Sequence, residues 1–226
     1  MLIRIRNLNK RIGSKVLYEN SSLNIEGSTN NALIGRNGSG KTTLFNILLG
    51  KDKDYTGEIE HRKGVRAIGT EQEHFAKKFD TISPIEYILD SVPEYNHLKK
   101  VISNPPKDIT ENYLLDLDRY STNGHFTIGN EIVETLERFG IQLESALNPI
   151  RELSGGQKRF VELTKVIYSK ADLILIDEPT NHLDLPSIEE LEQCLLDFRG
   201  SIIFVSHDSY FSKKIESKTI TLEKTS

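Results

Sequence analysis

The glycine-rich segment from residue 35 to residue 42 restricts the fold of this chain more than any other feature of its sequence. The apolar run 32–34 predicts a strand before it, and the breaker-free run 42–49, which stops at Gly50, predicts a helix after it. A strand, a glycine loop and a helix in this order are typical of a phosphate-binding loop, in which backbone N–H groups and the helix N-terminus hold phosphate oxygens. The loop consists of Gly35, Arg36, Asn37, Gly38, Ser39, Gly40, Lys41 and Thr42.

Two side chains at the end of this loop add chemistry to that of the backbone. We expect the ammonium group of Lys41 to reach the β and γ phosphates of a nucleotide, and the hydroxyl of Thr42 to ligate Mg²⁺. Thr43 follows directly and is a further candidate for nucleotide binding. The loop therefore predicts binding of a nucleoside triphosphate together with Mg²⁺.

A pair of acidic residues ends the apolar run 173–176, which predicts a buried strand. An acidic residue at the carboxyl end of a strand beside a phosphate loop suits a Mg²⁺ ligand, and we assign this role to Asp177. Successive side chains along a strand point in different directions, so Glu178 is directed elsewhere. Glu178 is the candidate general base that polarises an attacking water molecule.

Alternating strand and helix patterns surround a middle segment of different character. The runs 173–176 and 202–205 predict buried strands of a parallel sheet that is covered by helices. From about residue 82, prolines and apolar spacings of three and four predict a mostly helical subdomain. We expect one α/β domain over residues 1–226, with a catalytic core at 1–81 and 171–226 and a helical subdomain at about 82–170.

Leu153 begins a second glycine-containing motif, which opens a predicted helix and continues with Ser154, Gly155, Gly156 and Gln157. Ser154 is expected to cap this helix, and the two glycines expose the backbone at its positive end, which creates a second phosphate-binding surface. One γ-phosphate does not need two such surfaces. We therefore expect the second surface to serve a nucleotide that is held by another polypeptide.

With this LSGGQ motif, the phosphate loop and the acidic strand end, the chain resembles the ABC ATPase family. The resemblance implies a P-loop ABC ATPase cassette with an N-terminal antiparallel β subdomain, a mostly parallel core sheet and a helical subdomain. It implies that two cassettes pair head to tail, with each ATP and its Mg²⁺ between the phosphate loop of one and the LSGGQ motif of the other. Hydrolysis of ATP to ADP and phosphate is the activity that this resemblance implies.

Three further residues take their expected roles from the same resemblance. His207 matches the switch histidine that contacts the γ-phosphate, and it joins Glu178 and Lys41 as a candidate catalytic residue. Gln72 matches the glutamine that senses Mg²⁺. Asp184 ends the segment 181–184, which matches the D-loop that lies along the dimer seam.

The base-binding end of the predicted site departs from the family pattern. Near the N-terminus the family usually places an aromatic residue that stacks on adenine, and here that position falls on Arg11 or Ile12. Stacking is therefore expected to be weaker, or to come from Arg11 or Tyr18, although Tyr18 fits a core position better.

The runs 177–184 and 206–211 resemble those of the ABC-F branch, whose best-known members are translation and antibiotic-resistance factors that bind ribosomes. The implied partners are a second cassette and the ribosome. ABC-F proteins usually carry two cassettes, so we expect the chain to be half of a longer protein, a shortened form, or a single cassette that acts as a homodimer.

Composition supports a cytoplasmic protein. The net charge of -4 gives no general attraction to nucleic acid, and the single cysteine, Cys194, fits a buried and reduced thiol. No apolar run approaches the roughly 18 residues of a membrane span. Two alternatives stay open: the ATP-binding subunit of a transporter with a separate membrane permease, and a module that binds ATP without turnover.

Overall fold

The computed structural model describes residues 1–70, 81–181 and 183–222, and the chain divides into two compact units. Unit 1 comprises Met1–Gln72 and Ala171–Ser226, and unit 2 comprises Glu73–Lys170. The sequence places the first boundary near residue 82, and the positions between the two boundaries fall mostly outside the described residues. In the described part of the chain, no helix is both long enough and apolar enough to cross a bilayer.

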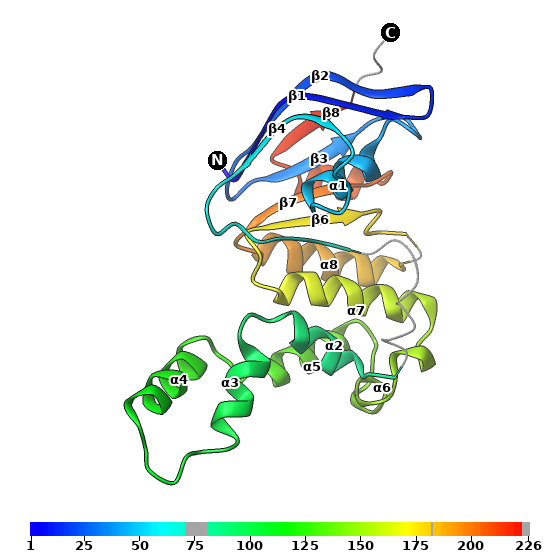
Figure 1. Ribbon diagram of the computed structural model, residues 1–226. Helices are drawn as coiled ribbons and strands as arrows, with labels where there is room; N and C mark the ends of the chain where they lie inside the picture. Colours follow the sequence, from blue (N-terminus) through cyan, green and yellow to red (C-terminus); the bar gives the residue numbers. More distant parts are fainter. Residues whose placement is uncertain (71–80, 182, 223–226) are drawn as a thin grey trace. The chain divides into compact units, whose positions relative to one another are not determined.

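Unit 1 contains a three-stranded antiparallel sheet in the order β2-β1-β4 (Figure 1). Its strands are β1 (Ile3–Ile12), β2 (Lys15–Ile25) and β4 (Thr56–His61). The apolar runs 2–5, 16–18 and 23–25 predict short strands here, whereas the structure has two long ones, β1 and β2. Register shifts interrupt the pairing of β1 with β2, and Asn7 and Asn20 adopt φ values of 51° and 45°. Such bulges break the two-residue alternation, which is why the sequence pattern looks fragmented.

The second sheet of unit 1 has five parallel strands in the order β5-β6-β7-β3-β8. They are β5 (Ala67–Gly69), β6 (Leu173–Asp177), β7 (Ser201–Val205), β3 (Asn30–Ile34) and β8 (Lys218–Thr221), and the helices of the unit are α1 (Lys41–Leu48), α8 (Leu185–Asp197) and α9 (Ser209–Ile215). Every residue of β6 and β7 is buried, as their unbroken apolar runs predict.

Side-chain alternation along β7 separates the two faces of the parallel sheet. Ile203 and Val205 join the core cluster that also contains α1 and the inner face of β1 and β2. Phe204 packs edge to face against Phe211 of helix α9, with ring centroids 5.5 Å apart. Because β3, β6 and β7 run in the same direction, the loops that follow them emerge at one edge of this sheet.

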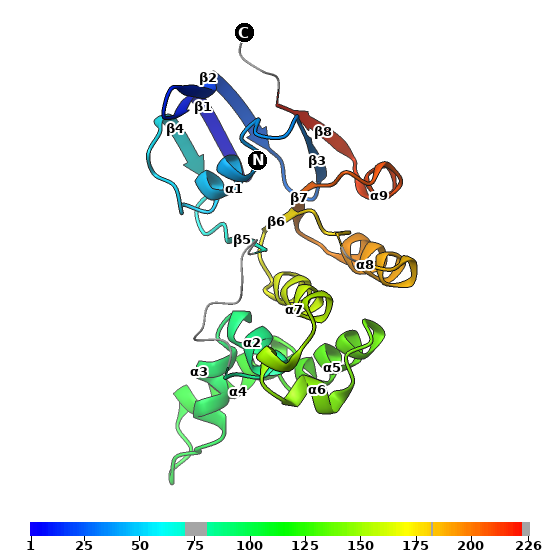
Figure 2. The same ribbon diagram turned by 90° about the vertical axis from the view of Figure 1, so that its right-hand side faces the viewer.

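Unit 2 is helical, as the sequence predicts (Figure 2). Its elements are α2 (Pro84–Ser91), α3 (Tyr95–Ile102), α4 (Glu111–Thr122), α5 (Ile128–Arg138), α6 (Leu143–Leu147), the 3-10 helix η2 (Ile150–Glu152) and α7 (Gly155–Tyr168). The core combines apolar side chains with a buried carboxylate, that of Glu162: the hydroxyl of Tyr87 donates to Glu162 Oε2 at 2.6 Å and accepts from Lys165 Nζ at 2.6 Å. This pairing satisfies a carboxylate that would otherwise be buried without compensation.

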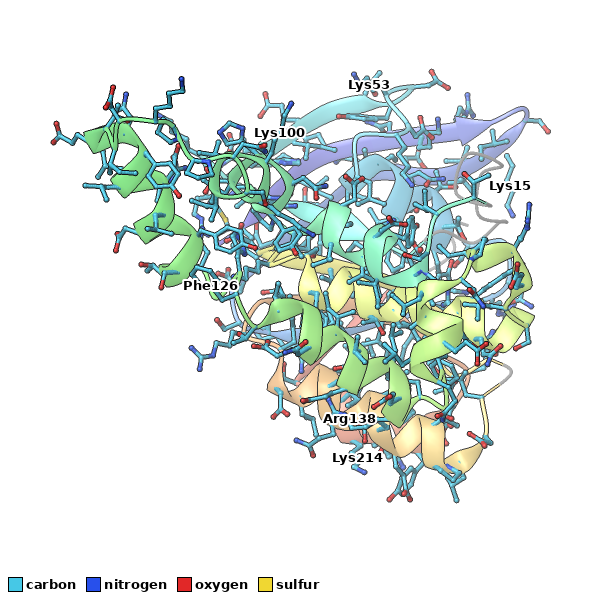
Figure 3. The ribbon with its side chains drawn as sticks, turned by 90° about the horizontal axis from the view of Figure 1, so that it is seen from below. Lys15, Lys53, Lys100, Phe126, Arg138 and Lys214 are labelled. Carbon is cyan, nitrogen blue, oxygen red and sulfur yellow. The ribbon has the colours of Figure 1, made fainter. Side chains whose placement is uncertain are left out.

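Helices α3 and α4 form a smaller packing centre of their own within unit 2. The ring of His125 is buried and lies edge to face with Tyr95, at 5.4 Å between centroids, and with Tyr120, at 5.2 Å. Burial lowers the pKa of His125 from its ordinary value. Phe126, by contrast, is exposed on the surface (Figure 3).

Candidate functional site

The glycine loop lies between β3 and α1, and two of its glycines are required by geometry. Gly38 and Gly40 adopt φ values of 75° and 103°, which side chains of L-residues rarely allow. A Cβ atom at Gly40 would also lie 2.7 Å from the hydroxyl oxygen of Tyr18. Gly40 is the N-cap of α1 and supplies no side-chain cap, so the first N–H groups of this helix depend on other partners.

Side chains hold this loop through its carbonyl oxygens. Lys41 Nζ donates to the carbonyl of Gly35 at 2.8 Å, Lys15 Nζ donates to that of Gly38 at 2.6 Å, and the Tyr18 hydroxyl donates to that of Gly40 at 2.6 Å. Tyr18 is buried, and burial raises the pKa of its hydroxyl. Tyr18 therefore supports the loop from the core, as the core interpretation predicts, and does not line the pocket described below.

Asp177 meets the start of α1 at the end of strand β6. Its Oδ2 accepts a hydrogen bond from the Thr42 hydroxyl at 3.2 Å, and its backbone N–H donates to Thr70 Oγ1 at 3.3 Å. Only 7% of the Asp177 surface is exposed. A carboxylate and a hydroxyl placed side by side are hard oxygen donors, which are the ligands that Mg²⁺ prefers, so this pair fits the predicted metal.

Glu178 leaves the strand in a different direction from Asp177. Its backbone has φ 50°, an uncommon value for a residue with a side chain, and its N–H donates to the carbonyl of Val205 at 2.8 Å. Glu178 Oε1 lies 3.2 Å from Nε2 of His207, which follows the neighbouring strand β7. The parallel pairing of β6 with β7 thus brings together two side chains that are far apart in the sequence.

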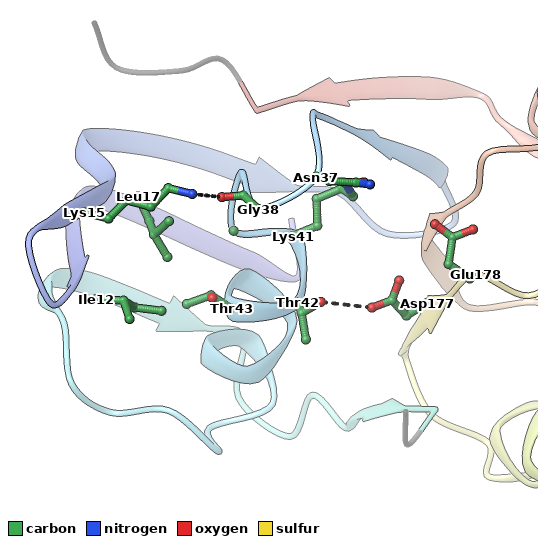
Figure 4. Close-up of a pocket in the computed structure, with 11 residues that line it drawn as sticks. Ile12, Lys15, Leu17, Asn37, Gly38, Lys41, Thr42, Thr43, Asp177 and Glu178 are labelled. Carbon is green, nitrogen blue, oxygen red and sulfur yellow. Dashed lines mark hydrogen bonds between the residues drawn. The ribbon is translucent and has the colours of Figure 1, made fainter. Parts of the chain in front are cut away.

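A pocket of about 500 Å³ opens over the glycine loop (Figure 4). It is lined by Ile12, Lys15, Leu17, Asn37, Gly38, Gly40, Lys41, Thr42, Thr43, Asp177 and Glu178. Its volume falls within the roughly 300–1,000 Å³ that is usual for small-molecule sites. Ser39 Oγ is buried at the loop without a hydrogen-bond partner among the described residues, a hydroxyl suited to a phosphate oxygen. The pocket and the loop therefore fit a nucleotide.

Sequence reasoning missed two residues of this pocket, Lys15 and Leu17. Both owe their place to the pairing of Ile12 with Lys15 across a two-residue turn, which only the structure reveals, because directly paired residues face the same side of a sheet. Of the two positions considered for the base, Ile12 lines the pocket and Arg11 does not.

The LSGGQ motif lies in unit 2, at the start of helix α7. The Ser154 hydroxyl accepts a hydrogen bond from Gln157 N–H at 3.2 Å, and Gln157 Oε1 accepts one from Ser154 N–H at 3.0 Å, which is a complete capping box. A Cβ atom at Gly155 would meet nothing within 4 Å. Packing of the described residues therefore does not require a glycine at this position.

The remaining predicted residues are placed less fully. Asp184 is exposed and caps helix α8, accepting a hydrogen bond from Ser187 N–H at 3.2 Å. Hydrogen bonding to the side chain of Ser187, and then to its backbone N–H, lowers the pKa of the Asp184 carboxyl. Gln72, predicted to sense Mg²⁺, and His182 in the predicted D-loop lie outside the described residues. Arg36 follows β3 and contributes its carbonyl, which accepts from Lys41 Nζ at 3.3 Å.

Residues 18–181 match the family model described as ABC transporter. The chain is 31% identical to the ABC transporter ATP-binding protein YfmR of Bacillus subtilis, a match that covers 99% of this chain and 36% of the relative. It is 28% identical to the ribosome protection protein VmlR of the same organism, over 97% of this chain and 34% of VmlR. It is 32% identical to ABC transporter F family member 4 of Arabidopsis thaliana, over 87% of this chain and 23% of that protein.

Solved structures show the same fold. An ATP-binding cassette of an ABC transporter is similar with a TM-score of 0.68 and 18% identity, and the match covers 99% of this chain and 88% of that chain. A metal-chelate type ABC transporter is similar with a TM-score of 0.66 and 22% identity, over 99% of this chain and 80% of that chain. The fold class predicted from the sequence is thus confirmed. The chain spans about a third of the length of the relatives YfmR and VmlR.

Proposed function

Because the chain belongs to the ABC transporter family of ATP-binding cassettes, we propose that it binds ATP with Mg²⁺ and hydrolyses the γ-phosphate bond. The observation that carries this proposal is the convergence of two distant segments on one pocket. The glycine loop with Lys41 lines it from one side, and Asp177 with Glu178 lines it at the end of strand β6. The pocket therefore combines a phosphate cradle with the carboxylates that hydrolysis requires.

Each polar group of the pocket has a separate task in this proposal. Lys41 binds and orients the β and γ phosphates, and the backbone N–H groups at the start of α1 surround them. Thr42 and Asp177, which already share a hydrogen bond, hold Mg²⁺, and Gln72 assists them. An ion held by these residues would supply positive charge to the phosphate oxygens.

Glu178 is the proposed general base. Its carboxylate polarises the attacking water, and its position at the end of β6 directs it away from the Thr42–Asp177 pair. His207, 3.2 Å from Glu178, braces the γ-phosphate and limits the movement of the carboxylate. The positive φ of Glu178 is consistent with this role, because residues with an unusual backbone conformation are often found at functional sites.

A second cassette would complete the site. Helix α7 begins with Gly155, which is exposed, and Gly156, which is half-buried, and the first N–H groups of a helix have no partners within it. Since packing does not require Gly155, an outside ligand is the better reason for a glycine there. We assign Ser154 to Gln157 to the ATP of the partner cassette, and Asp184 to the seam between the two.

The Glu178→Gln variant tests this mechanism. We expect steady-state phosphate release to fall by roughly 10²- to 10⁴-fold, because the water loses its base, while ATP binding is retained. Light scattering should show a dimer of this variant with Mg-ATP and a monomer without it. The control Glu189→Gln removes an exposed carboxylate of helix α8 and should keep wild-type turnover. Normal turnover by Glu178→Gln would exclude Glu178 as the base.

The cellular partner of the proposed ATPase has two candidates. The name of VmlR, a ribosome protection protein, favours the ribosome, and the description of the matching family model, ABC transporter, favours a membrane permease. Since the chain spans about a third of such relatives, a second cassette of the same protein is an equal candidate for the dimer partner. Pelleting of the full-length protein with ribosomes in the presence of ATP, against copurification with a permease, separates the two candidates.

ATP binding without turnover is a separate candidate function, which differs from an ATPase that acts on the ribosome and from one that acts on a permease. The aliphatic residue at the base-binding position favours it, since weaker base contacts suit a module that responds to nucleotide rather than consuming it. Phosphate release by the wild-type protein that is no faster than release without enzyme, with the partner present, would establish this binding module in place of the ATPase.

A further inference from the structure

The β1–β2 hairpin forms one end of the nucleotide pocket. Ile12 and Lys15 pair directly across its two-residue turn, where Gly13 adopts φ 58°, so their side chains share one face of the sheet. Leu17, two residues further along β2, returns to that face. All three side chains line the pocket beside the glycine loop (Figure 4).

This hairpin offers the pocket an aliphatic surface and a single cation. Ile12 and Leu17 can cover a flat ring by dispersion, but neither side chain can form a hydrogen bond with the edge of a base. Ile12 is 57% exposed, as expected for a surface that a ligand would cover. Among the described residues that line the pocket there is no aromatic ring.

Lys15 differs from an ordinary surface lysine in where its ammonium group lies. Nζ donates to the carbonyl of Gly38 at 2.6 Å, and a Cβ atom at Gly38 would lie 3.1 Å from it. In the described part of the chain no carboxylate forms an ion pair with Lys15. Lys41 is bound in the same manner, to the carbonyl of Gly35. The pocket therefore contains two ammonium groups that are held by neutral carbonyls and can turn to an anion.

We propose that Lys15 is a second cationic residue that binds the nucleotide phosphates, and that the pocket discriminates only weakly between adenine and guanine. This inference rests on the proposed nucleotide function and names its substrate class as purine nucleoside triphosphates. With two cations, most of the binding free energy comes from charge-assisted hydrogen bonds to the phosphates, which ATP and GTP share. Ile12 and Leu17 offer no hydrogen-bonding group to a base edge, and an aliphatic surface of this kind cannot strongly reject a base of similar shape.

Competition against a fluorescent ATP analogue tests both parts of the proposal. We expect ATP and GTP to displace the analogue with dissociation constants within about fivefold of each other. Lys15→Ala should weaken both nucleotides by the same factor, about tenfold, and Lys15→Arg should retain wild-type affinity. The matched control is Lys63→Ala, which removes an exposed lysine of the same unit outside the pocket and should change neither constant.

Ile12→Tyr tests the base-binding end separately. An aromatic ring at this position should stack on the base and raise the affinity for ATP by roughly fivefold, without changing the effect of Lys15→Ala. GTP binding about 30-fold weaker than ATP binding, or unchanged affinity in Lys15→Ala, would overturn this inference and leave the proposed function standing. Failure of wild-type protein to bind any nucleotide would overturn the proposed function as well.

Discussion

Helix α1 of unit 1 and helix α7 of unit 2 both begin at a glycine-containing motif, but their first turns are stabilised in different ways. The N-cap of α1 is Gly40, with φ 103° and no side chain to cap the helix. The N-cap of α7 is Ser154, which forms a reciprocal capping box with Gln157. One helix start depends on residues from elsewhere in the fold, and the other stabilises itself.

This difference indicates how far the N-terminus of each helix depends on contacts with other elements of the fold. The α1 loop is held through carbonyl oxygens by Lys15 and Tyr18 of strand β2 and by Lys41. The α7 cap uses residues three positions apart, and helix α2 begins with the same type of box, formed by Ser83 and Glu86. A local capping box forms wherever the helix forms, whereas the α1 loop requires the folded β hairpin.

The largest difference that we expect between substitutions at the N-termini of α1 and α7 is in the affinity for nucleotide. Lys41→Ala removes the cation of the α1 loop, and we expect the dissociation constant for ATP to rise about 100-fold, because two charge-assisted hydrogen bonds to phosphate are lost. Competition with a fluorescent nucleotide measures it, and a thermal melt checks that the variant is folded. Lys63→Ala serves as the control. A change below about fivefold would show that Lys41 does not bind the phosphates.

The second effect is on stability and concerns glycine itself. Gly40→Ala places a side chain at φ 103° and within 2.7 Å of the Tyr18 hydroxyl, so we expect a loss of about 2–3 kcal/mol in the free energy of unfolding. Urea denaturation measures this loss. The control is Gly129→Ala in helix α5, where an added Cβ meets nothing within 4 Å and alanine should stabilise by about 0.5–1 kcal/mol.

The same contrast decides what could be predicted from the sequence. The α7 cap was predictable because Ser154 and its glycines are neighbours in the chain. The place of the glycine loop between a strand and a helix, and that of Asp177 at a strand end, were predictable because neighbouring residues in the chain fix both. Lys15 was not, because its role depends on the register of β1 with β2, which bulges shift between residues 5 and 11. The Glu178–His207 contact likewise depends on the pairing of β6 with β7.

A smaller effect tests whether the α7 cap has a role beyond stability. Ser154→Ala and Ser83→Ala remove the same type of cap from helices α7 and α2, and each should cost about 1 kcal/mol of unfolding free energy in urea. In the Glu178→Gln background, only Ser154→Ala should also weaken the ATP-dependent dimer measured by light scattering. Equal dimer formation by both variants would restrict Ser154 to a structural role.

Helix α8 begins in a third way, with a charged cap, and it gives the smallest expected effect. The N–H of Ser187 donates to Asp184. Hydrogen bonding to the side chain of Ser187, and then to this N–H, lowers the pKa of the Asp184 carboxyl from its ordinary value of 3.8. A carboxyl with a lowered folded-state pKa stabilises the fold above the unfolded-state pKa, and this contribution disappears as the pH falls through the folded-state value. Asp184→Asn keeps the cap but removes the charge.

Wild type should therefore be slightly more stable than Asp184→Asn at pH 7, and the difference should shrink as the pH falls below about 4. Urea denaturation of both proteins between pH 3 and pH 7 measures this difference. Asp108→Asn, at an exposed loop position, corrects for the change in net charge. A difference that stays constant down to pH 3 would mean that the Asp184 carboxylate contributes no charge-dependent capping. Helix α8 would then depend, like α7, on a neutral hydrogen bond alone.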